Sequence, residues 1–133
     1  MFNHDSPQRN KKFLLPRIIK YLKSKNIKEL KKIYELNIKG DFSHAEDICQ
    51  GIILLMKNKI NLDKIILSSN KFTNINSIIN FLIKKNKLNI KIKSKKNATN
   101  IKLLGNNKLA KKILKWKPRK NYLNAALESY RFN

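Results

Sequence analysis

The spacing of hydrophobic residues predicts a chain in which helices alternate with short strands. Five stretches repeat apolar side chains at intervals of three and four, which places them on one face of a helix: residues 15–22, 45–57, 75–82, 109–114 and 123–130. Three shorter stretches are predicted as strands, the last because its apolar and polar residues alternate: residues 32–36, 64–68 and 88–92. Residues 37–41 are predicted as a loop. This alternation indicates an α/β or α+β fold class.

The segment from Ser43 to Lys57 carries the clearest helix signal. Ser43 and Glu46 have the spacing of a capping box, in which the Ser43 hydroxyl accepts from the Glu46 amide. Six residues then trace the side that we expect to be buried: Ala45, Ile48, Cys49, Ile52, Ile53 and Met56. Cys49 is the only cysteine, so we interpret it as a buried small hydrophobe. The expected caps of the later helices are Thr73 or Asn74, Asn106 or Asn107, and Asn121.

The charge of the chain is strongly basic but poor in arginine. The formal net charge is +23, which usually indicates a nucleic acid or an anionic membrane as partner. Only 4 of the 31 basic residues are arginine, the residue that grips phosphates and base edges bidentately. The 27 lysines, 19 asparagines and 19 isoleucines are almost half of the 133 residues, and all three have A/T-rich codons. Genome base composition therefore explains much of the charge.

Several classes of protein are disfavoured by what the chain contains. The longest apolar run, residues 52–56, is far too short to span a bilayer. The polar start has no apolar core of a signal peptide, so we expect a cytoplasmic protein with no membrane partner. One cysteine and two histidines, without carboxylates at ligand spacing, do not make a metal site. Gly40, Gly51 and Gly105 are too far apart to form a glycine-rich phosphate loop.

The first ten residues hold the densest group of candidate chemistry. Within seven positions they carry an amide (Asn3), an imidazole (His4), a carboxylate (Asp5), a hydroxyl (Ser6) and a guanidinium (Arg9). Such a loop could bind a polar ligand that bears a phosphate. The alternative interpretation is an N-terminal arm of mixed composition.

Three segments carry a resemblance to known enzymes. Residues 2–9 (FNHDSPQR) resemble F-N-H-E-S-P-x-R, and residues 39–47 (KGDFSHAED) resemble K-R-D-W-G-H-A-x-D. Residues 103–118 resemble L-L-x-G followed by K-A-x-x-x-L-G-W-x-P. In this order the segments are similar to the GDP-mannose 4,6-dehydratases of the extended short-chain dehydrogenase/reductase family, also called NAD-dependent epimerases/dehydratases. The second and third segments are shared widely by nucleotide-sugar epimerases and dehydratases.

The resemblance implies a fold and a set of site residues. It implies the α/β class: the C-terminal part of an extended Rossmann-type enzyme, with an incomplete parallel sheet and one substrate-binding domain over residues 1–133. By matching positions, Asn3 would contact the nucleotide sugar, and His4 and Arg9 would contact the cofactor NADP. Arg17 would face the diphosphate of the substrate, and Lys39 would lie on the loop that approaches the nucleotide.

The chain also departs from the family pattern. The dinucleotide-binding domain, with its glycine-rich loop and its catalytic Tyr-x-x-x-Lys pair, lies upstream of the first motif in the family and is absent here. Tyr21 and Lys25 have that spacing, but they follow the substrate loop, so we treat the match as coincidence. Gly40 replaces a phosphate-facing Arg, and residues 95–100 replace an Arg-Pro-x-Glu anchor. Lys115 replaces a Gly, and in a left-handed cap it would cost about 1 kcal/mol.

Two hypotheses about function follow. The first is a truncated or split nucleotide-sugar dehydratase that contributes the sugar-nucleotide clamp and part of the NADP wall. It would not catalyse alone, and it would act with a companion chain or be an inactive remnant; a fragment of another nucleotide-sugar epimerase is a variant of this hypothesis. The second is a small basic module that binds RNA or DNA. The scarcity of arginine and the lack of aromatic residues among the basic runs disfavour it. For a fragment we also expect an exposed apolar face, and hence poor solubility or dependence on a partner.

Overall fold

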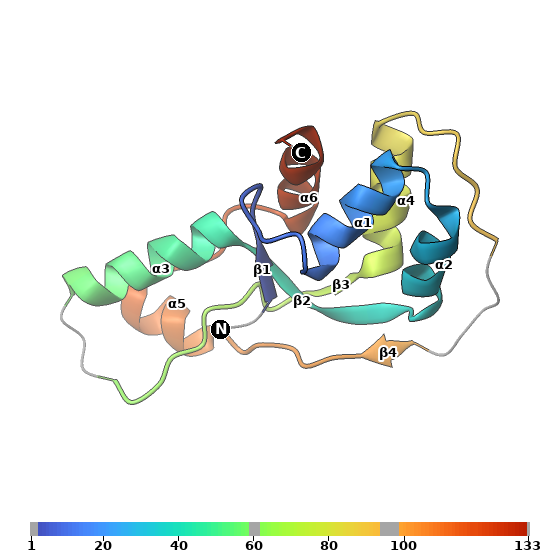
Figure 1. Ribbon diagram of the computed structural model, residues 1–133. Coiled ribbons are helices and arrows are strands. Elements are labelled where there is room, and N and C mark those ends of the chain that lie inside the picture. The colour runs from blue at the N-terminus through green and yellow to red at the C-terminus, as the bar shows by residue number, and fades with distance from the viewer. Residues whose placement is uncertain (1–2, 59–61, 94–98, 133) are drawn as a thin grey trace.

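The computed structural model describes residues 3–58, 62–93 and 99–132. Its elements are, in chain order, β1 (Asn3–Asp5), α1 (Leu14–Lys23), α2 (Ile27–Glu35), β2 (Ile38–His44), α3 (Ala45–Lys57), β3 (Phe72–Asn74), α4 (Ile75–Lys85), β4 (Asn100–Ile101), α5 (Lys108–Leu114) and α6 (Tyr122–Phe132). Figure 1 shows α3 and α5 extending to one side of β2, and α1, α2 and α4 gathered at its other side. This confirms the predicted α/β class. Within the described ranges, no helix is long and apolar enough to cross a bilayer.

Strand β2 is the centre of the sheet. Its second half pairs in parallel with β1, so that Asn3 lies opposite Phe42 and Asp5 opposite His44. Its first half pairs antiparallel with β3 and in parallel with β4. All the described strands therefore meet on one seven-residue strand, and the first motif of the chain is held beside the second.

The larger core lies between β2 and the helices α1, α2, α4 and α6. The inward residues predicted for α1 and α4 are all buried: Leu15, Ile18, Ile19, Leu22, Ile75, Ile78, Ile79 and Leu82. Asn74 caps α4 as predicted, because its side-chain oxygen accepts from the Asn76 amide at 2.8 Å. Helix α6 begins after Asn121 as predicted, but its buried face differs from the predicted face. Tyr122, Ala125, Ala126 and Ser129 are buried, whereas Leu123, Leu127 and Tyr130 are half-buried.

The predicted strand at residues 32–36 and the predicted loop at 37–41 are both wrong. Residues 32–35 belong to α2, and 38–41 belong to β2. Asn26 caps α2 by accepting from the Glu29 amide at 3.2 Å, and Leu30 and Ile33 are buried at helical spacing. The strand prediction was based on a short apolar run and did not take the Asn26 cap into account.

The strands predicted at residues 64–68 and 88–92 are also absent from the described residues. Leu67 and Ser68 are buried without strand pairing, and the strand comes later, as β3. Residues 88–92 do alternate in burial, with Ile90 buried and Lys91 exposed, and they pack against the larger core. The apolar pattern was therefore real, but it reflects burial of an extended segment that no neighbouring strand pairs with.

Helix α3 forms where it was predicted, with a different cap and a different buried face. His44 caps it, because its Nδ1 accepts from the Glu46 amide at 3.2 Å; Ser43 lies inside β2. The buried residues are Asp47, Ile48 and Gly51, which face a small core of Leu67, Ala110, Leu114 and Trp116. Cys49, Ile52, Ile53 and Met56 are exposed, Met56 by 74%, so the prediction that they are buried is wrong.

Helix ends in this chain use left-handed residues that are not glycine. Lys25, Asn37, Lys87 and Lys115 follow α1, α2, α4 and α5 with φ values of 51°, 45°, 50° and 52°. Lys115 occupies the position of the family's Gly, so the expectation of a left-handed cap there is confirmed. The Cβ of a lysine makes this conformation about 1 kcal/mol less favourable than it is for glycine.

Two buried carboxylates join the parts of the fold. Asp41 is fully buried: Oδ1 accepts from the backbone amide and hydroxyl of Ser69, and Oδ2 accepts from the amides of Asn70 and Gly105, each at 3.0 Å. Asp47, in the first turn of α3, accepts from the amides of Arg119 and Lys120 at 3.0 and 2.8 Å. These bonds fix three loops to β2 and α3.

We expect Asp41→Asn to lower the free energy of unfolding by about 2–4 kcal/mol, because an amide nitrogen would then face backbone N–H donors in a buried site. Urea denaturation followed by circular dichroism measures this loss. Asp63→Asn is the matched control, because it removes the same charge from an exposed side chain. Equal effects of the two substitutions would contradict the role given to Asp41.

We expect Lys115→Gly to raise the free energy of unfolding by about 0.5–1 kcal/mol, because glycine adopts φ 52° without strain. Lys117→Gly, two residues further on at a position without positive φ, should be neutral or destabilising. The same denaturation experiment compares them. Stabilisation by both substitutions, or by neither, would argue against strain at Lys115.

Candidate functional site: a cavity at the ends of β1 and β2

A cavity of about 300 Å³ lies at the carboxyl ends of β1 and β2. Because the two strands are parallel, the loop after β1 and the first turns of α3 meet at the same edge of the sheet. The lining residues are His4, Ser6, Gln8, Arg9, Asn10, Phe13, Ala45 and Cys49. The polar cluster of the first motif therefore forms one wall of a cavity, and α3 forms the other.

The guanidinium of Arg9 is held in place but keeps unused hydrogen-bonding capacity. Its Cζ lies 3.5 Å from the centroid of the Phe13 ring, a cation–π contact. Its Nε lies 3.8 Å from Asp5 Oδ1, beyond hydrogen-bond distance, and this buried nitrogen has no hydrogen-bond partner among the described residues. A buried donor without a partner is costly. The Arg9 side chain as a whole is 28% exposed and lines the cavity, so the rest of its guanidinium can donate to an anion there.

Asp5 connects this cavity to α6. The Tyr122 hydroxyl donates to Asp5 Oδ2 at 2.6 Å, and both side chains are buried. Burial raises the pKa of Asp5, while the Tyr122 hydroxyl and Arg9 oppose that rise. Burial, and then the Asp5 charge, raise the pKa of Tyr122 well above 10, so Tyr122 remains a hydrogen-bond donor. In the sequence, Asp5 stands out only as part of the polar cluster, and no pattern pairs it with Tyr122, which lies 117 positions away.

The other predicted site residues lie outside this cavity. Asn3 is exposed on β1, and its Nδ2 lies 3.5 Å from the backbone oxygen of Asp41. The ammonium of Lys39, on β2, lies 5.2 Å from the centroid of the Phe72 ring. Asn3 and Lys39 therefore lie on the paired part of β1, β2 and β3. Neither residue lines the His4–Arg9 cavity, and neither lines the cavity beside α1 that is described next.

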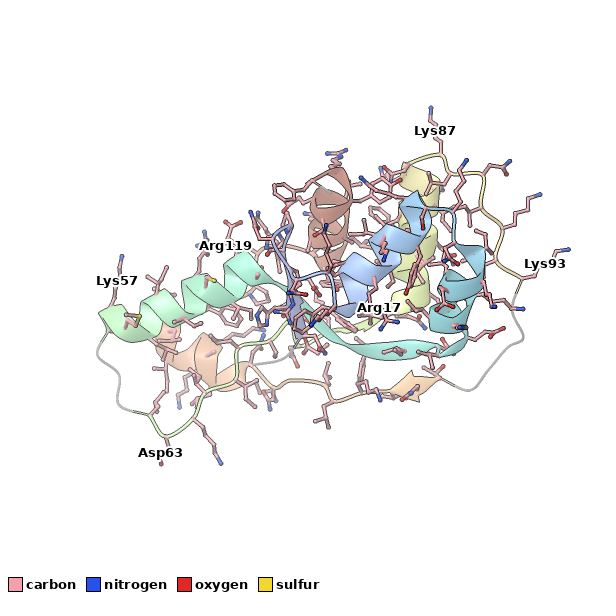
Figure 2. The ribbon with its side chains drawn as sticks, in the orientation of Figure 1. Arg17, Lys57, Asp63, Lys87, Lys93 and Arg119 are labelled. Carbon is pink, nitrogen blue, oxygen red and sulfur yellow. The ribbon has the colours of Figure 1, made fainter. Side chains whose placement is uncertain are left out.

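Arg17 lies in a separate, basic cavity of about 600 Å³ beside α1. It is exposed near the start of that helix, where Figure 2 labels it. The cations that share this cavity with Arg17 are Lys11, Lys20 and Lys23. The structure thus brings His4 and Arg9 together and separates them from Arg17. Residues 95–98, which carry most of the altered second anchor, lie outside the described residues.

An exposed apolar stripe begins at the His4–Arg9 cavity. Cys49 lines the cavity, and Ile52, Ile53 and Met56 follow it on α3 at helical spacing. Their exposed fractions are 38%, 48% and 74%. We call Cys49, Ile52, Ile53 and Met56 the α3 stripe.

Comparisons with known proteins agree with the fold. Residues 1–126 match the family model described as GDP-mannose 4,6 dehydratase. The structure resembles UDP-glucuronic acid 4-epimerase from Bacillus cereus in complex with NAD, with a TM-score of 0.74 and 16% identity over 98% of this chain and 42% of that one. It also resembles RMD from Pseudomonas aeruginosa complexed with NADPH, with a TM-score of 0.75 and 15% identity over 98% and 45%.

A third similar structure is MlghC, the GDP-mannoheptose C4 reductase from Campylobacter jejuni with NADP bound. Its TM-score is 0.70, with 12% identity over 98% of this chain and 46% of that one. At these identities the three structures show a shared fold, and this chain spans less than half the length of each. A comparison with curated proteins finds no sequence match.

The family match covers all three motifs, and it includes every residue that lines the His4–Arg9 cavity. The chain therefore belongs to the GDP-mannose 4,6 dehydratase family, among the NAD-dependent epimerases and dehydratases that act on nucleotide sugars.

Proposed function

We propose that this chain is the substrate-binding half of a nucleotide-sugar dehydratase of the GDP-mannose 4,6-dehydratase type, and that it does not catalyse alone. Family membership supports the class of reaction. The observation that carries the proposal is the buried Arg9 Nε without a partner, in a cavity shared with His4 at the carboxyl ends of two parallel strands. Ligands of open α/β sheets bind at that edge.

The cavity residues fit part of a phosphate-bearing dinucleotide. Arg9 would donate to a phosphate oxygen, and His4 would contact the same ligand from β1. A volume of about 300 Å³ is at the lower limit for a small-molecule site, so it holds one part of NADP and leaves the rest to another domain. When bound, NADP would supply the hydride chemistry of such a reaction, an oxidation at C4 of the sugar and a reduction at C6.

The nucleotide sugar would lie against the other matched residues. Asn3 can donate to and accept from sugar hydroxyls, since its carboxamide has only one long contact, at 3.5 Å. Lys39 and Arg17 would bring positive charge to the nucleotide and its diphosphate. In this assignment the cofactor residues form one group, and the substrate residues extend along β2 and α1.

The geometry of the chain's own tyrosines supports the inability to catalyse alone. Tyr21 and Lys25 have the spacing of the family's catalytic pair, but α1 ends at Lys23 and Lys25 has a left-handed backbone with φ 51°. The two side chains therefore do not follow one another on a helix face, as an i, i+4 pair must. Removal of the C4 hydroxyl proton would require a base from elsewhere.

The α3 stripe supports a companion chain that carries the dinucleotide-binding half. Four neighbouring apolar side chains on one helix face, next to a cavity that holds only part of the cofactor, are typical of a surface that another domain covers. A companion seated there would complete the cofactor site from the α3 side. Nothing in the comparisons supports the alternative of a nucleic-acid-binding module.

We expect NADPH to shift the backbone amide signals of residues 4–13 and 45–49 in a ¹⁵N NMR titration. Arg9→Gln should weaken this binding about tenfold, the loss expected for one charge-assisted hydrogen bond. Arg131→Gln, which removes the same charge from an exposed position on α6, should leave it unchanged. If both variants weakened binding equally, the interaction would be a non-specific charge attraction, and the assignment of Arg9 to the cofactor site would be wrong.

We expect the lone chain to self-associate through the α3 stripe, because this apolar surface has no cover. Ile53→Asp should shift sedimentation toward monomer and change the free energy of unfolding by less than about 0.5 kcal/mol, as for other surface substitutions. Leu36→Asp, at the end of α2 and 52% exposed, is the matched control. If Leu36→Asp had the same effect as Ile53→Asp, the stripe would have no special role.

A further inference from the structure

A third cavity lies away from the proposed cofactor site, and none of its lining residues lines the His4–Arg9 cavity. It has a volume of about 180 Å³ and lies between the turn at residues 69–73 and the segment 118–122. Phe42 and Tyr122 form its apolar part, with ring centroids 5.1 Å apart. Lys71 and Thr73 come from one wall, and Arg119 and Asn121 from the other.

Both walls are fixed by the buried carboxylates that join the fold. Asp41 binds the amides of Ser69 and Asn70 at the base of the first wall. Asp47 binds the amides of Arg119 and Lys120 in the second wall. The cavity is therefore shaped before any ligand arrives, which lowers the entropic cost of binding.

The cations of this cavity differ in whether a carboxylate pairs with them. Lys120 pairs with Glu46 and lies 3.7 Å from Glu128, so its charge is balanced by carboxylates. Neither Lys71 nor Arg119 has a carboxylate within ion-pair distance in the part of the chain that the structure describes. Asp41 and Asp47, which hold the walls, already accept hydrogen bonds from backbone amides. Lys71 and Arg119 thus come from opposite walls of a small cavity, and each keeps a charge that no ion pair engages within the described residues.

We propose that this cavity binds a phosphate group, either as inorganic phosphate or as a phosphate monoester. Arg119 supplies a planar, two-pronged donor, and Lys71 supplies a point charge from the opposite wall. The Thr73 hydroxyl and the Asn121 carboxamide add neutral hydrogen-bonding groups. The aromatic pair takes no phosphate oxygen, but it offers an apolar surface to the organic part of a monoester. The site is independent of the proposed enzymatic function.

Trp116 provides a built-in reporter for this site. It is the only tryptophan, and its indole N–H donates to the backbone oxygen of Asp47 at 2.9 Å. Asp47 in turn holds Arg119 and Lys120, so a ligand that moves this wall changes the environment of the indole. Figure 2 labels Arg119 next to the first turns of α3, the helix that carries Asp47.

The test is a ¹⁵N NMR titration of the whole chain with sodium phosphate, and separately with glucose 6-phosphate, at constant ionic strength set with sodium chloride. We expect saturable shifts in the amides of 69–73 and 119–122 and in the Trp116 indole. Tighter binding of glucose 6-phosphate would identify a monoester site, and equal or tighter binding of phosphate an inorganic phosphate site. The double substitution of Lys71→Gln and Arg119→Gln should weaken binding at least about tenfold.

The matched control is the double substitution of Lys84→Gln and Lys85→Gln on α4, which lowers the net charge equally away from the cavity. It should leave the affinity unchanged, and Arg119→Lys, which keeps the charge but not the fork, should fall between wild type and Arg119→Gln. Shifts that spread over the lysine-rich surface without saturating would overturn the proposal. So would equal weakening by the two double variants, each of which is first checked for the wild-type amide pattern.

Discussion

The buried carboxylate of Asp41 determines how the loops of this protein are arranged around β2. Its two oxygens accept from four donors in the segments before β3 and before α5, which lie 28 to 64 positions away in the chain. A buried charge is stable only when it is fully hydrogen-bonded, so the loops must close around it. Asp5 and Asp47 act in the same way toward Tyr122 and toward residues 119–120. Three of the eight acidic residues thus tie β1, β2 and α3 to segments that are distant in the chain.

Of the helices that pack on the larger core, α1, α4 and α6 could be predicted from sequence, whereas α2 and the strands could not. Residues such as Ile18, Ile19, Ile78 and Ile79 are buried on one face of a helix whose other face is polar, so periodicity reveals them. The described strands have two to seven residues and depend on β2, which contains a glycine and polar residues. Their position is decided by distant partners and by Asp41, which local patterns do not contain. For the candidate site, His4 and Arg9 of the first motif line one cavity, but the motif did not reveal the support from Asp5.

Helix α3 shows why a correct helix prediction can give the wrong buried face. The helix is apolar on two sides: Ile48 and Gly51 face the small core, and the α3 stripe faces outward. Gly51 allows a close approach, since a Cβ there would lie 2.8 Å from Leu67. The larger apolar side chains of the α3 stripe, which the helical periodicity predicts to be buried, are exposed. Sequence periodicity reports which faces must be covered, but not which are covered within one chain.

The positions of the arginines distinguish candidate anion sites from the generally basic composition of this chain. Lysine supplies 27 of the 31 basic residues, and its codons are A/T-rich. Arg9, Arg17 and Arg119 each line a different cavity, and the fourth, Arg131, is exposed near the end of α6. Arginine offers a rigid pair of donors that lysine lacks, so an anion site is the place where the two are least interchangeable. We therefore base the proposed phosphate contacts on the three arginines that line cavities, and not on the net charge.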